Sequence, residues 1–442
     1  MAPHYLADLV VTNLSEAWYL LESREINSRY LYNKESCELG LLPPLPDHQL
    51  QHTIANLLKT KKIIVKPSSS PEKYLERKET PRLMLFLTAA CNLKCVYCHC
   101  SSKAEKAHMS EDCALNIVQR YIRHVKEVTG NTDKIEITFM GGGEPLLRIN
   151  TIKKIIGYLE EMGIHGEYVL VTNATLGSDR DWEWIVSKGF RITISADGPP
   201  NVQNRQRVFA NGSRRTSDYI ERRLLHLSSF AIDINIRSTV MEVSAESINS
   251  ICGYFQGFSC VKTHHLEPVS FAGRGNAYKN VSEEEFYRQF FSNYSRHLYE
   301  NPQRFKSAWF KPFKKSQGFC GAVYFNTVIT HDGFISLCSE VDSSSMSSTY
   351  GDKYIVSHIQ DDNPFLPKKS IDFSENNSIE NIPECRSCII SYKCGGGCYI
   401  KRDRDFKDND QFYNAFCKNA VMLNMSYLIG SIKNVNQQSV PI

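Results

Sequence analysis

The sequence predicts an α/β protein built around a parallel sheet. Short apolar segments are typical of strands, amphipathic helical patterns follow them, and polar or glycine-rich turns stand at the strand ends. Six β/α units in series favour right-handed crossovers and a ligand site at the carboxyl ends of the strands. The expected strands are LMLFLTA (83–89), KIEITF (134–139), EYVLVT (167–172), FRITIS (190–195), AIDINIRSTV (231–240) and HHLEPV (264–269).

The segment between the first two strands has the clearest helical pattern. Ser110 is a good N-cap, with Glu111 and Asp112 in the first turn. Comparable helical patterns follow later strands, in TIKKIIGYLEEM (151–162) and DYIERRLLHL (218–227). The apolar stripe of the first helix is formed by Ala114, Ile117, Val118, Tyr121, Ile122 and Val125.

Length and composition narrow the class of protein. A chain of 442 residues, 42% of them hydrophobic, predicts two or three domains. The net charge of +4, from 52 basic and 48 acidic residues, is too balanced to indicate a nucleic-acid surface. The start MAPHYLADLV lacks the features of a signal peptide, and no stretch approaches the ~18 apolar residues of a membrane span. We therefore expect a cytoplasmic protein, with neither nucleic acid nor a membrane as partner.

The three cysteines of CNLKCVYC have a spacing suited to an iron–sulfur cluster. Cys91, Cys95 and Cys98 can ligate three irons of a 4Fe-4S cluster and leave the fourth iron open to chemistry. In a reducing compartment, fifteen cysteines are better explained by metal ligation than by disulfides. The alternatives for this motif alone are a three-ligand zinc site and a set of buried thiols.

Glycine-rich and polar turns follow the expected strands. In GGGEPLL (141–147), after the second strand, glycines allow the backbone to approach a ligand closely while Glu144 is held at the strand tip. In SADGPP, after the fourth strand, Ser195 and Asp197 offer a hydroxyl and a carboxylate for hydrogen bonding. Taken alone, GGGEPLL is equally well explained as a tight turn, and SADGPP is better explained as an Asp-Gly-Pro turn.

The motifs CNLKCVYC, GGGEP, TNAT, SADGPP and RST stand in the order that characterises the radical SAM enzymes. Over about residues 81–275 the chain resembles this family. The resemblance implies a partial (β/α)6 barrel, more open than a complete eightfold barrel. It also implies that the open iron of the first cluster chelates S-adenosylmethionine.

The same resemblance implies where S-adenosylmethionine is bound. Gly142, Gly143, Glu144 and Pro145 match the element that binds its ammonium group, and Tyr97 is the usual aromatic residue before the third cysteine.

Five further cofactor-binding residues are also implied. Ser195 and Asp197 are expected at the ribose or the methionine end, and Arg237 at the carboxylate. Asn173 is expected near the cofactor and Leu266 at the adenine. For Asn173 and Arg237 the alternative is a structural role in buried strands, and for Leu266 it is an ordinary strand end.

A second cysteine pattern fills the C-terminal part of the chain and resembles the SPASM extension of peptide-modifying and protein-modifying radical SAM enzymes. The alternative is a pair of zinc knuckles. By the resemblance, Cys385, Cys388, Cys394 and Cys417 hold one auxiliary 4Fe-4S cluster. The other auxiliary cluster receives the three ligands Cys320, Cys338 and Cys398.

The fourth ligand of that second set is left open by the sequence. Some family members place a further cysteine a few residues after the first SPASM cysteine, but the segment CGAVYFNTV (320–328) has none. An open iron would take a substrate thiolate, a non-cysteine ligand or water. The remaining cysteines are interpreted as buried free thiols, although Cys100 is close to the first cluster motif in the sequence. They are Cys37, Cys100, Cys113, Cys252 and Cys260.

About eighty residues precede the first cluster motif. The segment 45–67 predicts a helix followed by a strand, and 68–81 a linker. Many maturases of ribosomally made peptides carry a winged-helix module here that binds the leader as an added strand. A capping extension without a ligand explains this segment equally well. The expected domains are 1–80 as extension, 81–310 as barrel and 311–442 as SPASM domain.

The predicted function is a radical SAM oxidoreductase that matures a precursor peptide. A 5'-deoxyadenosyl radical would remove hydrogen from a side chain, and an intramolecular cross-link would follow, carbon–carbon or ether first and thioether next. The expected cofactors are S-adenosylmethionine and three 4Fe-4S clusters. The expected partners are the precursor peptide and a flavodoxin-like or ferredoxin-like reductant.

Two alternatives remain open. An anaerobic sulfatase maturase would oxidise Cys or Ser to formylglycine, and its acidic base directly follows the second SPASM cysteine. Here Ser339 holds that position, and Glu340 one residue further is a weak candidate for the base. A non-catalytic electron-transfer protein would explain the clusters but would have no use for the GGGEP and SADGPP series.

Overall fold

The computed structural model describes most of the chain. The described residues are 9–14, 18–23, 28–35, 38–42, 49–50, 54, 82–100, 108–213, 215–270, 273–278, 282–311, 318–324, 327–343, 351–365, 367–405, 410, 413–425 and 427. None of the described helices has the length and apolarity that crossing a membrane requires.

Six parallel strands form the centre of the molecule and follow one another in chain order. They confirm the six predicted strands and the parallel pairing. Their bounds are β5 (Arg82–Leu85), β6 (Lys134–Phe139), β7 (His165–Thr172), β8 (Arg191–Ser195), β9 (Ile234–Val240) and β10 (Val261–Pro268). Only β5 is much shorter than predicted, because the chain leaves the ladder after Leu85 to form the cysteine-bearing loop.

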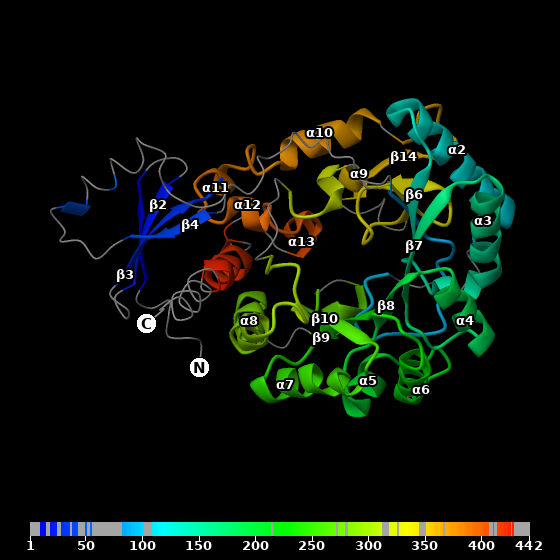
Figure 1. Ribbon diagram of the computed structural model, residues 1–442, viewed down its shortest axis with the longest axis horizontal. Helices are drawn as coiled ribbons and strands as arrows, with labels where there is room; N and C mark the ends of the chain where they lie inside the picture. The colour runs from blue at the N-terminus through cyan, green and yellow to red at the C-terminus, as the bar shows by residue number, and fades with distance from the viewer. Residues whose placement is uncertain are drawn as a thin grey trace, which may run out of the picture.

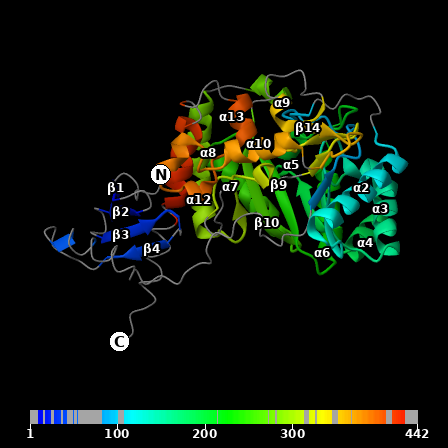
Figure 2. The same ribbon diagram turned by 90° about the horizontal axis from the view of Figure 1, so that it is seen from above.

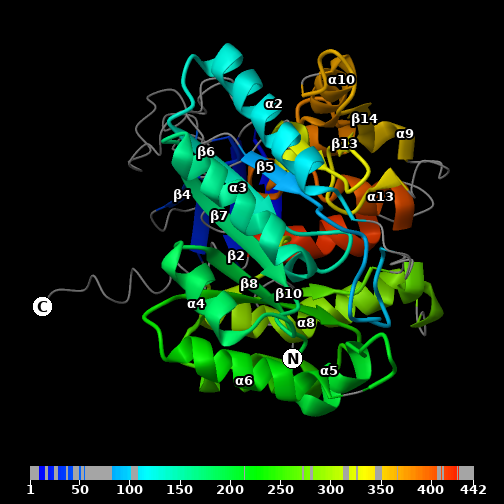
Figure 3. The same cartoon turned by 90° about the vertical axis from the view of Figure 1, so that its right-hand side faces the viewer.

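Helices cover the outer face of the curved sheet (Figures 1 and 3). They are α2 (Glu111–Thr129), α3 (Ile149–Glu161), α4 (Asp179–Ser187), α5 (Pro200–Gln206), α6 (Thr216–Ser228), α7 (Ala245–Tyr254) and α8 (Glu283–Glu300). In α2 the predicted apolar stripe faces the core, although Ile122 is only partly buried. The predicted N-cap is also present, since Ser110 Oγ accepts from Cys113 N over 3.1 Å.

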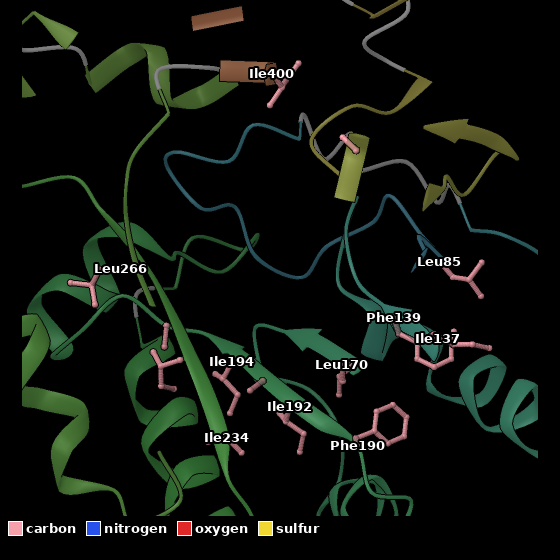
Figure 4. Packing of buried hydrophobic residues seen from close by; sticks show 14 of the residues in the cluster. Leu85, Ile137, Phe139, Leu170, Phe190, Ile192, Ile194, Ile234, Leu266 and Ile400 are labelled. Carbon is pink, nitrogen blue, oxygen red and sulfur yellow. The ribbon is translucent and has the colours of Figure 1, made fainter. Parts of the chain in front are cut away.

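The apolar core lies between the sheet and these helices. Figure 4 shows side chains from neighbouring strands in this layer, among them Leu85, Ile137, Leu170 and Ile194. All four are fully buried. Alternate residues of a strand point to opposite faces, so the positions between the buried ones are free to carry polar side chains on the concave face.

The C-terminal part of the chain adds strands to the same sheet. Strand β11 (Phe305–Lys306) pairs parallel with β10, and β12 (Thr327–Ile329) pairs parallel with β5 at the opposite edge. Strands β13 (Phe334–Ser336) and β14 (Ile355–His358) continue antiparallel beyond β12. The ten-stranded sheet therefore runs across the expected domain boundary at residue 310, and it ends in the edge strands β11 and β14.

Short helices complete the C-terminal part above the sheet (Figure 1). They are α9 (Gly351–Tyr354), α10 (Lys368–Asn377), α11 (Pro383–Arg386), α12 (Ser391–Cys394), α13 (Tyr399–Asp405) and a π-helical turn (Tyr413–Cys417). Helices this short contribute little stability by themselves, so the region depends on its packing and on its cysteine-bearing loops.

A second sheet lies at one end of the molecule, beside α11 and α12 (Figures 1 and 2). Its antiparallel strands are β1 (Leu9–Asn13), β2 (Trp18–Ser23), β3 (Ser28–Asn33) and β4 (Glu38–Leu41), paired in that order. The sequence did not predict this N-terminal sheet. The helix and strand predicted for 45–67, the linker predicted for 68–81 and Cys37 fall largely or wholly outside the described residues.

Replacing Ser110 by alanine tests the N-cap of α2. The free energy of local opening of the first helical turn is expected to fall by about 1 kcal/mol, which speeds amide hydrogen exchange there about fivefold. Ser110→Asp keeps a capping oxygen and serves as the control. Equal exchange rates in the alanine variant and the wild type would contradict the cap.

Candidate active site

The loop that carries Cys91, Cys95 and Cys98 is fixed by backbone bonds to the GGGEP turn. Gly143 N donates to Thr88 O over 2.9 Å, and Glu144 N donates to Ala90 O over 2.9 Å. These are bonds between two irregular loops, so neither loop has this shape without the other.

The glycines of this turn make the close approach possible. A Cβ on Gly143 would lie 1.8 Å from the carbonyl oxygen of Ala90, which no side chain permits. Gly142 has φ +55° and Gly141 has φ +74°, a region that glycine adopts without strain. The sequence assigned these glycines to close contact with a ligand. The structure shows that they contact the cysteine loop, while Gly142 and Gly143 also line the cavity described below.

A second set of bonds holds the other flank of the cysteine loop. Lys94 N donates to Val208 O over 2.7 Å, just beyond the end of α5. The guanidinium Nε of Arg274 donates to Cys95 O over 2.8 Å. The loop is therefore anchored from two sides of the barrel mouth.

The first two thiols of the loop are partly buried and approached by N–H groups. Burial raises the pKa of Cys91 to about 12 and that of Cys95 to about 11, so both are neutral thiols until a metal takes their protons. Leu93 N lies 3.4 Å from Cys91 Sγ, and Asn173 Nδ2 lies 3.9 Å from the same sulfur. Arg207 Nη1 lies 4.0 Å from Cys95 Sγ. N–H groups directed at ligating sulfurs are usual at iron–sulfur sites, so this donor set fits a three-thiolate cluster.

The three cysteines open onto a cavity of about 660 Å³ at the carboxyl ends of the strands. This is within the usual size of a small-molecule site. Six of the ten predicted cofactor-binding residues line it: Gly142, Gly143, Glu144, Asn173, Ser195 and Arg237. The other four are buried or engaged elsewhere: Tyr97, Pro145, Asp197 and Leu266.

Strand alternation explains one of these exceptions. On β10, Thr263 and His265 line the cavity, whereas His264 and Leu266 are fully buried. Leu266 therefore faces the core and its side chain does not reach a ligand in the cavity. The buried His264 donates from Nε2 to Ser238 Oγ, which in turn donates to Ala196 O. His264 is thus a structural residue.

Tyr97 and Asp197 belong to a buried triad that supports the cysteine loop. The Tyr97 hydroxyl donates to Asp197 Oδ2 over 2.7 Å, and Arg207 Nε pairs with Asp197 Oδ1 at 3.0 Å. Thr239 N also donates to Asp197 Oδ1. Both oxygens of Asp197 accept these bonds, and the residue has no exposed surface. It positions Arg207, which lines the cavity beside Cys95.

Glu144 is held as the fully buried acceptor of three bonds. Thr172 Oγ1 donates over 2.5 Å, Asn173 N over 2.8 Å and Leu146 N over 3.1 Å. Burial nevertheless raises the pKa of Glu144 to about 7. A cation next to this carboxylate would favour its charged form, so the site is suited to a positively charged group.

Asn173 is presented by a strained turn after β7. Ala174 has φ +56°, a left-handed conformation that is uncommon for alanine. Asn173 Nδ2 donates to Asn92 Oδ1 over 2.9 Å, and Asn173 Oδ1 accepts from Thr175. Strain of this kind is retained where the surroundings require one orientation. Here it aims the amide of Asn173 at the cysteine loop.

The C-terminal region reaches the same cavity through Ser339 and Glu340. Arg404 Nη2 donates to Glu340 Oε2 over 3.0 Å. Burial disfavours the charged form of Glu340, but His99, Arg404 and Lys401 outweigh it and lower the pKa to about 2. Glu340 is thus an anion held in place by cations.

Several cavity residues were not predicted from the sequence. His265 and Lys306 are two of these, and the pairing register places them on β10 and β11 beside the predicted Arg237 of β9. The sequence gives little indication of this arrangement, because single basic residues on strands are common. Only the pairing register shows that these three side chains are neighbours. Arg207 and Arg274 follow α5 and β10 without any motif. Further lining residues that the sequence had not assigned are His99, Cys100, Met140, Asn235 and Thr263.

Cys320, Cys338 and Cys398 come together beside Glu340. Burial raises the pKa of Cys338 well above its usual value, and the nearby charges of Glu340, Cys398 and Cys320 add to the effect. Glu340 N lies 3.4 Å from Cys338 Sγ. The three thiols that the sequence grouped are therefore neighbours in the fold, close to the cavity.

Cys385, Cys388, Cys394 and Cys417 form the other group. Burial raises the pKa of Cys385, and the thiolates of Cys394, Cys388 and Cys417 raise it further. The segment 395–397 has φ of +75°, +88° and +76°, and its last two amides donate to Cys394 Sγ. Successive left-handed glycines turn N–H groups toward one anion, as four-thiolate clusters require.

Throughout the described residues, no three His, Cys, Asp or Glu side chains converge closely enough to hold one metal ion. The fourteen described cysteines are free of disulfides. Of those that the sequence left unassigned, Cys252 and Cys260 are buried as predicted, while Cys100 lies in the cavity wall next to Cys98.

Comparison with known proteins connects this geometry to a family. Residues 85–247 match the family model of the Radical SAM superfamily. A cysteine-type anaerobic sulfatase-maturating enzyme of Clostridium perfringens is 26% identical over 369 residues, covering 76% of this chain and 94% of that enzyme. An uncharacterized protein of Methanocaldococcus jannaschii is 30% identical over 178 residues, covering 40% of this chain and 58% of that protein.

Two solved structures share the fold. Native anSMEcpe with bound AdoMet and Kp18Cys peptide has a TM-score of 0.64 at 21% identity, covering 81% of this chain and 100% of that one. Streptococcus suis SuiB bound to the precursor peptide SuiA has a TM-score of 0.52 at 13% identity, covering 91% and 97%. The similarity in fold therefore extends well beyond residues 85–247.

Gly143→Ala tests the contact between the GGGEP turn and the cysteine loop. The added Cβ displaces the Ala90 carbonyl, so we expect the protein to lose about four irons after anaerobic reconstitution, those of the first cluster. Gly157→Ala is the matched control, because a Cβ on Gly157 of α3 meets nothing within 4 Å. Iron analysis and far-UV circular dichroism give the result. Full iron content in Gly143→Ala would contradict the role of this contact.

Proposed function

Because this chain is a radical SAM enzyme with the fold of the SPASM-type maturases, we propose that it cross-links side chains of a ribosomally made precursor peptide. One observation carries the proposal. The cavity is lined both by the first cysteine loop and by Ser339 and Glu340, which directly follow Cys338 of the second group. A side chain in this cavity would lie between a radical source and a second redox centre.

Membership of the family implies S-adenosylmethionine and a 4Fe-4S cluster, for which Cys91, Cys95 and Cys98 are the proposed ligands. When bound, this pair supplies a 5'-deoxyadenosyl radical by reductive cleavage of S-adenosylmethionine. We assign the ammonium group to Glu144, whose buried carboxylate accepts hydrogen bonds from three uncharged donors. Asn173, Ser195 and Arg237 line the remainder of the proposed cofactor site.

The auxiliary groups are proposed to hold two further 4Fe-4S clusters. Cys385, Cys388, Cys394 and Cys417 supply four thiolates and would complete one cluster. Cys320, Cys338 and Cys398 supply three, next to the cavity. Glu340 lies beside this second group and is held there by Arg404.

The proposed reaction balances as a two-electron oxidation of the peptide. One bond forms between two side chains, carbon–carbon or carbon–oxygen, with a carbon–sulfur bond as the next choice. One hydrogen atom leaves the peptide for 5'-deoxyadenosine. The second hydrogen leaves as a proton. Its electron would be taken up by the auxiliary cluster that Cys320, Cys338 and Cys398 would hold, with a flavodoxin-like or ferredoxin-like protein as the proposed final acceptor.

The chain's own residues have a simple part in this reaction. The cavity walls hold the target carbon near the radical source and exclude water and oxygen. Beyond Arg237, which is assigned to the cofactor site, Lys306 presents a positive charge from β11 beside His265 of β10, which suits an acidic or carboxylate-bearing segment of the peptide. We further propose that the N-terminal sheet recognises the leader segment through an edge strand, β1 or β4.

Formylglycine formation is the second candidate, and the Clostridium perfringens relative favours it. In this chain Ser339 holds the position expected for the acidic base. Glu340 does line the cavity, but with a pKa lowered to about 2 it is a poor proton acceptor. We therefore rank this reaction second. A non-catalytic electron-transfer role is set aside, because the chain is a radical SAM enzyme.

The test compares two substrates with the reconstituted protein, S-adenosylmethionine and dithionite. One is a peptide encoded by a short reading frame beside the gene, and the other is the Kp18Cys peptide. The proposal is supported if the first peptide gives a product that is lighter by two hydrogens and does not react with an aldehyde probe. Tandem mass spectrometry should show a cross-link in that product. An aldehyde formed on the second supports formylglycine formation. Deoxyadenosine without change in either peptide contradicts both.

Glu144→Gln tests the ammonium site. The variant keeps the shape of the side chain and removes its charge, so we expect the Kd for S-adenosylmethionine to rise about tenfold or more while iron content stays near that of the wild type. Equilibrium dialysis under anaerobic conditions measures the Kd.

Glu136→Gln is the matched control for this variant. Glu136, on β6, is a buried carboxylate like Glu144, but it pairs with Arg82 and Arg191 outside the cavity. Equal Kd values for Glu144→Gln and the wild type would remove Glu144 from the cofactor site.

A further inference from the structure

The N-terminal sheet packs directly on the four-cysteine group of the C-terminal region. One face of β2 and β3 and the loops around the cysteines form a single buried cluster, separate from the main core. Its residues are Tyr19, Leu21, Tyr32, Ile389, Ile390, Ala420 and Met425, with Cys388 and Cys394 packed against them.

Two side chains of the sheet bind the short loop between Cys385 and Cys388. The Tyr19 hydroxyl donates to Ser387 O over 2.8 Å. The Lys34 ammonium donates to Arg386 O, the preceding carbonyl. Arg386 and Ser387 are the two residues that separate these cysteines. Both of their carbonyls are thus fixed by a segment more than 350 residues earlier in the chain.

The position of Lys34 also has an electrostatic consequence. Its side chain is 6% exposed, so the ammonium has little water around it and needs anionic or polar partners. The Lys34 ammonium donates to the Arg386 carbonyl, so its positive charge lies at the loop between Cys385 and Cys388, and Lys34 and Cys385 line the same cavity. Four thiolates on one metal cluster carry excess negative charge, and reduction adds one further negative charge. A nearby cation therefore favours the reduced state.

We propose that Lys34 and Tyr19 are positioning residues of the auxiliary cluster at Cys385, Cys388, Cys394 and Cys417, and that Lys34 raises its reduction potential. This inference rests on the proposed function for the existence of that cluster. It gives the N-terminal extension a role beyond peptide recognition. The extension completes a redox centre, so a ligand that shifts β2 or β3 changes the electron affinity of that centre.

A cavity at this junction supports the coupling. It has a volume of about 400 Å³ and is lined by Tyr19, Lys34 and Glu35 from the sheet, and by Cys385, Arg386 and Tyr392, among others, from the C-terminal region. The two parts therefore meet across a partly hollow contact rather than a fully packed one. Contacts of this kind shift at lower cost than a close-packed core.

The experiment uses the full chain with Cys91→Ala, Cys95→Ala and Cys98→Ala as the reference background, so that only auxiliary clusters give a signal. Iron is counted after anaerobic reconstitution, and the potentials are measured by redox titration monitored by electron paramagnetic resonance. Lys34→Met removes the charge, and Tyr19→Phe removes only the hydrogen bond. Arg29→Met is the control, because Arg29 is a cation of the same sheet that pairs with Glu22 at 2.8 Å.

We expect about eight irons in the reference and in all three variants. In Lys34→Met, the ratio of reduced to oxidised auxiliary cluster at a fixed solution potential falls about tenfold or more. This corresponds to a decrease in the reduction potential of about 59 mV for a one-electron couple. Tyr19→Phe leaves the potential unchanged but speeds loss of iron to a chelator, and Arg29→Met changes neither. Loss of about four irons in Lys34→Met alone also supports the positioning role.

Two results would overturn the inference, and they are distinguishable. Full iron with an unchanged potential in Lys34→Met shows that Lys34 does not act on a cluster. Only about four irons or fewer in the reference itself overturns the proposed second auxiliary cluster, whatever Lys34 does.

Discussion

The active site depends on hydrogen bonds between loops that have no regular structure of their own. The cysteine loop leaves β5 after Leu85 and is held by Gly143 and Glu144 on one flank and by the segment after α5 on the other. Because a Cβ on Gly143 would overlap the Ala90 carbonyl, this contact admits glycine only. The carboxylate of Glu144 and the thiols of the loop are thereby fixed relative to each other before any cofactor binds, which is the preorganisation that radical chemistry requires.

The second constraint is the continuity of the sheet. Strand β12 pairs with β5, so the C-terminal region is joined to the barrel beside the strand from which the cysteine loop begins. This attachment brings Ser339 and Glu340 into the cavity wall and places Cys338 near it. The same region carries the four-cysteine group, on which the N-terminal sheet packs. The N-terminal sheet therefore contacts the C-terminal region, and the C-terminal region contacts the barrel and its cavity.

Local patterns in the sequence were sufficient for the barrel and for the grouping of the cysteines. Alternating strands, the Ser110 cap and the order of the strand-end motifs are properties of neighbouring residues, and the structure has all of them. The features that the sequence did not reveal have one origin. Asp197 was expected at the cofactor, but its partner Arg207 is ten residues away and has no motif, so the buried triad with Tyr97 was invisible. Likewise, the contact of Lys34 with Arg386 and the pairing of β12 with β5 depend on long-range packing that leaves no local pattern.

The central claim is that three iron–sulfur clusters lie in this fold, two of them close to one cavity. Anomalous X-ray diffraction at the iron and zinc absorption edges, from crystals grown anaerobically after reconstitution, tests it most directly. The account predicts three iron peaks and no zinc peak, the first at Cys91, Cys95 and Cys98, and the others at the two C-terminal cysteine groups. Zinc at these groups, or iron at the first site alone, would contradict it.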